Sequence, residues 1–175
     1  AYREIILKYP DSPDEPQARA NLGLSLFKQG RSSEAIQEFS LLINKYGRDD
    51  DWRTVIGEAL FWRGYLMARS ASEGPSAANP NQALKDYREL ISRFPDSPRA
   101  DDAQFEVGFI TYSLGSSSEN KYSEAIAEYS KVLSNYTASE YSDDALFEIG
   151  RCYQLLGNQN KEEEFLRQLI KDYPN

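Results

Sequence analysis

The chain has 175 residues and is acidic, with 28 Asp and Glu against 20 Lys and Arg and a net charge of −8. That balance argues against nucleic acid and against an anionic membrane surface as partners. No apolar run approaches the roughly 20 residues that cross a bilayer, so we expect no direct membrane span. The chain has no histidine and one cysteine, which removes the commonest general base and any internal disulfide. We predict no catalytic residue, no cofactor and no metal.

Residues 17–46 have the pattern of two short amphipathic helices joined by a glycine turn. Apolar residues recur four apart in the first helix, which Gly30 ends. Gly23 lies inside that helix, where glycine costs about 1 kcal/mol relative to alanine. We therefore expect the second helix to pass close to Gly23, with the small Ala35 facing it. Residues placed to cap the second helices are Ser33, Asn81 and Ser123.

The same pattern returns three more times, at a period of roughly 40 residues. Its interior glycines are Gly23, Gly64, Gly108 and Gly150. A two-helix unit cannot bury its apolar face alone, and stacked neighbours bury a continuous core. The period therefore predicts an all-α helical solenoid rather than a single globular core.

The repeats resemble the tetratricopeptide repeat (TPR) family. The motif residues that carry the resemblance are Leu22-Gly23, Gly30, Ala35 and Phe39 with their equivalents. It also rests on the linker sequence YPDSP at Tyr9–Pro13, which recurs as FPDSP at Phe94–Pro98 and in part as Tyr173-Pro174. It implies a right-handed superhelical α-solenoid of helix-turn-helix repeats, with about nine helices and no strands. The long linkers are similar to those of bacterial envelope TPR proteins such as the TolA-binding cell-division coordinator and the outer-membrane β-barrel assembly lipoprotein. This linker style points to the periplasm or cell envelope, with the cytoplasm as the alternative.

We predict one TPR-like array over residues 1–175. Its parts are the second helix of a truncated repeat (1–9), repeat 1 (17–46), repeat 2 (52–94, with an inserted loop at 70–82), repeat 3 (98–136, with a short insertion at 116–120) and repeat 4 (141–173). The chain begins in the middle of a repeat, so we expect it to be an excerpt of a longer protein. Further repeats are possible upstream of Ala1.

Three residues depart from the pattern or need an explanation. Arg63 stands where the other repeats have Leu22, Val107 and Ile149, so either the register slips by one residue or this arginine reaches a partner. Glu162 replaces the small alanine of the last repeat, which predicts a loosened or solvent-facing final helix. Cys152 is expected to be a buried, inert thiol.

A second apolar stripe on the first helices is the candidate partner-binding surface. It lies nearly opposite the core stripe, and a helix that is apolar on both faces must be covered on both. The resemblance implies that this face lines a concave groove for a peptide or partner helix. The candidate groove residues are Phe61, Tyr65, Arg69, Phe105, Phe109, Tyr112, Phe147 and Arg151. The alternative is that these rings only seal one repeat against the next.

These observations predict a non-enzymatic scaffold or adaptor that binds a peptide, helix or protein domain, within a larger bacterial envelope protein. Two alternatives remain open at this point. The chain could be a structural component of a multiprotein assembly that docks through its convex face and ends. It could also be the regulatory TPR region of a larger enzyme.

Overall fold

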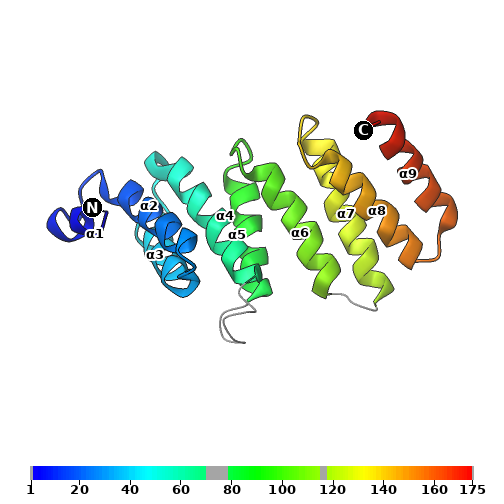
Figure 1. Ribbon diagram of the computed structural model, residues 1–175. Helices are drawn as coiled ribbons and strands as arrows, with labels where there is room; N and C mark the ends of the chain where they lie inside the picture. Colours follow the sequence, from blue (N-terminus) through cyan, green and yellow to red (C-terminus); the bar gives the residue numbers. More distant parts are fainter. Residues whose placement is uncertain (1, 70–78, 115–117, 175) are drawn as a thin grey trace. The chain divides into compact units, whose positions relative to one another are not determined.

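The computed structural model describes residues 2–69, 79–114 and 118–174. Over these residues the chain forms nine α-helices, one short 3-10 helix and no strand, which confirms the all-α, helix-turn-helix prediction (Figure 1). The chain divides into two compact units, Ala1–Arg99 and Ala100–Asn175. The description of the chain as one continuous array remains a prediction.

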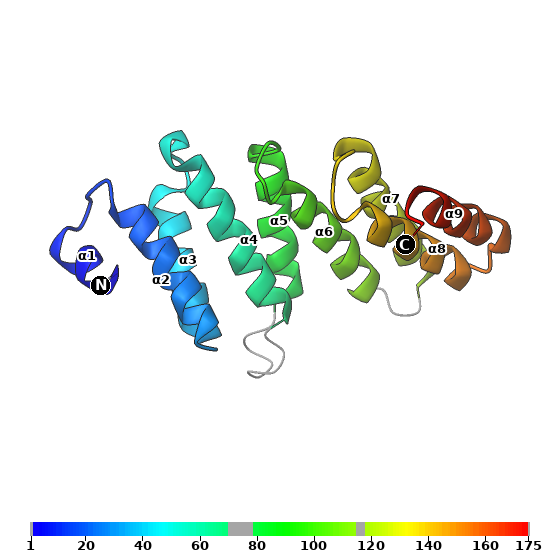
Figure 2. The same cartoon turned by 45° about the horizontal axis from the view of Figure 1, so that its top comes forward.

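The first unit contains five α-helices, and consecutive helices within it pack against one another. They are α1 (Tyr2–Lys8), α2 (Glu15–Lys28), α3 (Ser32–Tyr46), α4 (Arg53–Arg69) and α5 (Pro80–Arg93), with the 3-10 helix η1 (Asp50–Trp52) before α4. Helices α2 and α3 form one antiparallel pair, and α4 and α5 form the next (Figures 1 and 2).

The second unit contains two further helix pairs. They are α6 (Ala100–Leu114) with α7 (Glu119–Asn135), and α8 (Ser142–Leu155) with α9 (Gln159–Asp172). Helix α7 also packs against α8, and the side chains buried between them include Tyr129, Ile149 and Cys152. Helix α9 has no buried residue, as expected from the glutamate at position 162.

Two glycines make tight turns in the first and last helix pairs. Gly30 ends α2 with φ of 73°, and Gly157 follows α8 with φ of 70°. The Gly30 amide donates to the carbonyl of Phe27, and the next amide donates to the carbonyl of Leu26, which satisfies the last carbonyls of α2. A side chain rarely adopts this left-handed conformation, so glycine is favoured at both turns.

The interior glycines face large side chains rather than small ones. A Cβ added at Gly23 would lie 2.7 Å from the ring of Phe39, and one added at Gly108 would lie 2.6 Å from the ring of Tyr129. The nearest neighbour of Gly23 is therefore the Phe39 ring, rather than the Ala35 expected from the sequence. Glycine is needed because an aromatic ring on the second helix fills the space that a side chain would occupy.

The predicted capping residues are also wrong, because the second helices begin earlier than the sequence pattern suggests. Ser33, Asn81 and Ser123 all lie inside α3, α5 and α7. Asn79 instead caps α5 by accepting a hydrogen bond from the Gln82 amide at 3.0 Å.

The two predicted insertions fall largely on residues outside the described ranges. Residues 70–78 and 115–117 are not described. Helix α5 begins at Pro80 and α7 at Glu119, so the last residues of both predicted insertions are helical.

Candidate functional site

The eight candidate groove residues come from three helices. Those on α4, in the first unit, are Phe61, Tyr65 and Arg69, and those on α6 and α8, in the second unit, are Phe105, Phe109, Tyr112, Phe147 and Arg151. The structure brings candidates together within each unit, where they form two aromatic clusters.

In the first unit, the ring closest to the core is not available to a partner. Phe61 is only 4% exposed, and its ring lies 5.7 Å from that of Tyr87 on α5. Tyr65 is half-buried, with its ring 5.9 Å from that of Phe27 on α2. The guanidinium of Arg69 lies 4.2 Å from the centre of the Tyr65 ring, which places a cation at the exposed edge of the cluster.

In the second unit, one candidate ring also packs inward. Phe105 is half-buried, and its ring lies 5.3 Å from that of Tyr129 and 5.3 Å from that of Tyr141. Phe61, Phe105 and Phe147 occupy the same repeat position, and the first two pack inward while Phe147 is exposed. The contacts of Phe61 and Phe105 match the alternative in which the rings seal helices against one another.

The outer residues of the second cluster are joined by Arg151. Its Nη2 donates to the hydroxyl oxygen of Tyr112 at 3.2 Å, and its Nη1 donates to Glu148 at 2.9 Å. The guanidinium also lies 5.5 Å from the centre of the Tyr112 ring and 6.0 Å from that of Phe147. The Arg151 side chain nevertheless remains 43% exposed. Arg151 therefore links α6 to α8 and still presents its cation to solvent.

Two large apolar side chains accompany this arginine at the surface. Phe109 is 42% exposed and Phe147 is 46% exposed. Phe109 lies one turn before Tyr112 on α6, and Phe147 lies one turn before Arg151 on α8. Exposed aromatic rings beside an ordered arginine are the side chains that dominate protein interfaces.

The anomalous arginine of repeat 2 has an internal partner. Arg63 makes a bidentate ion pair with Asp86, with Nε and Nη2 each 2.7 Å from a carboxylate oxygen. The two side chains are 11% and 1% exposed. Gly64 faces Tyr87 as Gly23 faces Phe39, so the register holds. Asp86 therefore accounts for Arg63 without a partner protein.

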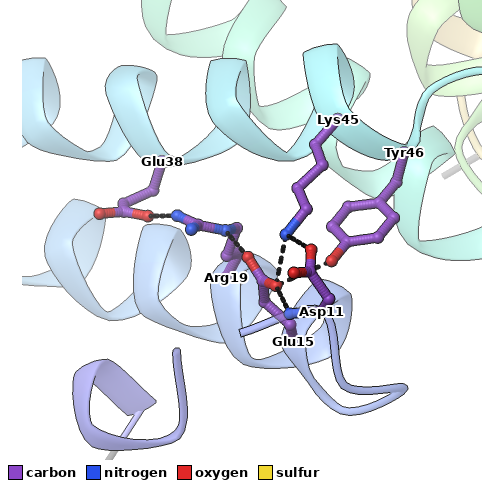
Figure 3. Close-up of polar contacts among 6 residues, drawn as sticks. All are labelled: Asp11, Glu15, Arg19, Glu38, Lys45 and Tyr46. Atoms are coloured by element: carbon purple, nitrogen blue, oxygen red, sulfur yellow. Dashed lines mark hydrogen bonds and ion pairs between the residues drawn. The ribbon is translucent and has the colours of Figure 1, made fainter. Parts of the chain in front are cut away.

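The sequence reasoning missed a buried carboxylate at the start of α2. Glu15 is 1% exposed and accepts four hydrogen bonds, which Figure 3 shows. Lys45 and Tyr46, at the end of α3, donate to its Oε2 at 2.7 and 2.8 Å. The amide of Asp11 also donates to Oε2 at 2.7 Å, and Arg19 donates to Oε1 at 2.7 Å.

This network changes the ionisation of Glu15. Burial alone raises the pKa of its carboxyl group, but the hydrogen bonds outweigh burial and lower the pKa from 4.5 to about 2. Both cations are shared with a second acid, because Arg19 donates to Glu38 at 2.9 Å and Lys45 lies 2.6 Å from Asp11 (Figure 3). The network holds the YPDSP linker against the first helix pair, which is a structural role.

The remaining reactive group is the cysteine. Cys152 is fully buried, as predicted. Burial and, after it, the charge of Glu148 raise the pKa of the thiol to about 11, so it stays protonated at neutral pH. Among the described residues, no group of three or more acids or cysteines could hold a metal ion. No described helix is long and apolar enough to cross a bilayer.

Solved structures share this fold at low sequence identity. A tetratricopeptide repeat protein from Parabacteroides merdae superimposes with a TM-score of 0.72 at 20% identity, over 99% of this chain and 58% of that protein. MamA gives 0.71 at 16% identity, over 98% of this chain and 84% of MamA. TPR-like repeats of a putative kinesin light chain from Podosopora anserina give 0.71 at 12% identity, over 99% and 84%. These likenesses confirm the TPR fold.

The family is shown by a match to the sequence itself. No curated protein matches the chain. The family model YfiO, described as an outer membrane lipoprotein, matches residues 2–169. The prediction that the chain resembles envelope TPR proteins is confirmed at the level of the family: the chain belongs to the YfiO family of TPR-fold proteins.

Proposed function

We propose that this chain is a non-enzymatic interaction scaffold of the bacterial cell envelope, which binds a peptide, helix or domain of another protein. The TPR fold supports the interaction class, since its repeats present extended surfaces to partners. The YfiO family description supports the envelope location. The chain spans 58% of the P. merdae protein that it superimposes on.

The observation that carries this proposal is an exposed surface of the second unit formed by Phe109, Tyr112, Phe147 and Arg151, which we call the ring–arginine surface. Arg151 is ordered by Tyr112 and Glu148 before any partner arrives, so little side-chain entropy is lost on binding. Phe147 adds exposed apolar area beside it, and Phe109 is exposed one turn before Tyr112 on α6. We assign the partner contact of the second unit to these residues, and Tyr65 and Arg69 form a candidate contact of the first unit by itself. Phe61 and Phe105 each pack inward within their own unit, so we assign them no partner contact.

The proposal that the chain lacks enzymatic activity rests on its side chains. The sequence has no histidine, and its one thiol is buried with a raised pKa. The large shift in the pKa of the Glu15 carboxyl group comes from a network that holds a linker. A perturbed pKa often marks an active site, but structural ion pairs cause the same shift.

Site-specific photo-crosslinking in the producing cells tests the surface. A photoreactive amino acid at Phe109, on a first helix, is compared with the same amino acid at Leu41, on the second helix α3. These positions are matched, because their side chains are 42% and 43% exposed. We expect a discrete crosslinked protein from position 109 and none from position 41. Crosslinking only from position 41 would favour docking through the second helices, as in the structural-assembly alternative.

The envelope location has its own test. We expect the protein to resist added protease in intact cells and to become sensitive when the outer membrane is permeabilised. Degradation only after complete lysis would place it in the cytoplasm.

A further inference from the structure

A groove between α8 and α9 is lined by acidic and apolar side chains, whereas the ring–arginine surface carries a cation. It has a volume of about 540 Å³ and lies where the start of α8 meets the end of α9. Its lining includes three apolar and three acidic side chains: Phe147, Ile170, Tyr173, Asp143, Asp144 and Asp172.

The apolar side chains of this groove are exposed to an unusual degree. Ile170 is 70% exposed and Tyr173 is 41% exposed. The equivalent of Ile170 in repeat 1 is Ile43, which is only partly exposed because α4 packs against α3. Among the described residues, no helix packs on α9 as α4 packs on α3, so this apolar face is open to a further helix.

Among the described residues, none of the three acidic side chains of the groove forms an ion pair. Asp143 and Asp144 lie in the first turn of α8, and Asp172 ends α9. Burial and then the charge of Asp143 raise the pKa of Asp144. Asp172 lies at the C-terminal end of α9, where the helix dipole supplies no compensating positive charge. The positive end of the α8 dipole partly offsets Asp143 and Asp144, and the three carboxylates together give the groove an acidic rim.

Several occupants are disfavoured by this chemistry. Among the described residues, no acidic cluster has the geometry to hold a metal ion. A second copy of this chain carries a net charge of −8 and would be repelled, as would an anionic lipid surface. A cationic partner with an apolar face satisfies both the charges and the exposed side chains.

We propose that this groove docks an amphipathic helix of a partner protein, with apolar side chains against Phe147, Ile170 and Tyr173 and with Lys or Arg side chains facing the three aspartates. A helix laid in an apolar groove is a common mode of peptide recognition, and the opposite charges fix its orientation. This groove shares Phe147 with the ring–arginine surface, and its other lining residues are separate from that surface. Its test uses neither Phe109 nor Arg151, so the two proposals fail separately.

The test uses two synthetic, fluorescein-labelled helical peptides of 18 residues. One is built from Leu and Lys with helical periodicity, and the other has Glu in place of each Lys. Fluorescence anisotropy at about 0.1 M salt measures binding to the 175-residue chain. We expect saturable binding of the Leu/Lys peptide, at least tenfold tighter than that of the Leu/Glu peptide. Equal affinities would overturn the proposal.

A matched pair of triple variants separates the groove from the general acidity of the chain. The groove variant is Asp143→Asn, Asp144→Asn, Asp172→Asn, and the control is Asp49→Asn, Asp50→Asn, Asp51→Asn at exposed positions of the first unit. Both remove three negative charges. We expect at least tenfold weaker Leu/Lys binding in the groove variant and at most twofold in the control. Equal weakening, or none in the groove variant, would overturn the proposal.

The apolar part is tested by Ile170→Ser, a change at a side chain that is 70% exposed. We expect at least fivefold weaker binding of the Leu/Lys peptide with an unchanged circular dichroism spectrum. Unchanged affinity would mean that charge alone attracts the peptide, which contradicts the docking groove. Sedimentation gives a further check: a dimer abolished by Ile170→Ser, together with unaltered peptide binding, would assign the groove to a second copy instead.

Discussion

The first and last complete helix pairs, α2–α3 and α8–α9, share a backbone plan but treat their acidic residues in opposite ways. Both pairs turn on a glycine with positive φ, and both have an interior glycine in the first helix. In the first pair, Glu15 at the start of α2 meets Lys45 in the last turn of α3. In the last pair, the position of Lys45 is held by Asp172, and α8 begins with two more aspartates.

The comparison shows which features the repeat keeps and which it varies. The glycines and the large side chains facing them determine how the two helices pack, so they recur. The charge in the last turn of the second helix is not needed for packing and is free to change. In the first pair, Lys45 forms ion pairs within the unit. We infer that in the last pair the charge of Asp172 is left for a partner.

The largest expected effect is at Glu15. Glu15→Gln leaves Lys45 and Arg19 with weaker acceptors, and we expect it to lower the free energy of unfolding by about 2–3 kcal/mol. This is less than the roughly 3–5 kcal/mol for breaking a fully buried ion pair, because Lys45 is 38% exposed. Urea unfolding followed by circular dichroism measures it. Asp144→Asn is the control, and we expect its stability to lie within about 0.5 kcal/mol of the parent or above it.

The stability difference between the parent and Glu15→Gln should depend on pH. Because the folded pKa of Glu15 is lowered from 4.5 to about 2, its contribution is fully present above pH 4.5 and is lost as the pH falls towards 2. The stability difference between the parent and Glu15→Gln should therefore shrink over this range. Urea titrations at pH 7, 4.5 and 3 measure it, and a difference that stays constant would show that the charge of Glu15 contributes nothing.

A smaller effect is expected at the interior glycines. In Gly23→Ala the new methyl group would lie 2.7 Å from the Phe39 ring, and we expect a loss of about 1.5 kcal/mol despite the better helix propensity of alanine. In Gly150→Ala the methyl group meets the flexible end of Leu166 at 3.2 Å, so the two effects should nearly cancel. Thermal unfolding of both variants tests this ranking, which equal losses would refute.

The smallest effect should come from copying the first pair into the last. Asp172→Lys places a cation near the two acids of α8 and at the favourable end of the α9 dipole, and we expect a gain of about 0.5 kcal/mol. The change should also abolish binding of the Leu/Lys peptide. A stabilised variant that still binds the peptide would show that the charge of Asp172 does not contribute to peptide binding.

The sequence predicted the repeat plan because helical periodicity and glycine spacing are local signals. It identified Gly23 as a close-contact site but assigned the wrong neighbour, since the reach of the Phe39 ring depends on how the helices cross. It flagged Arg63 as anomalous, but it could not find Asp86, which lies 23 residues away on another helix.

The candidate surface was predicted in part for the same reason. The stripe of aromatic residues is a helical pattern, so its members could be identified. Whether each ring faces solvent depends on neighbouring helices, and this separates exposed Phe109 from buried Phe61. The Glu15 network had no signal in the sequence, because Lys45 lies 30 residues from Glu15.

Carboxyl-carbon NMR titration of Glu15 and Asp144, with and without the Leu/Lys peptide, tests most directly the contrast between an acid neutralised internally and an acid left for a partner. We predict a pKa of about 2 for Glu15 that the peptide does not change. For Asp144 we predict a pKa above 3.8 that falls when the peptide binds. An Asp144 pKa below 3.8 in the free chain, or one that the peptide leaves unchanged, would contradict the account.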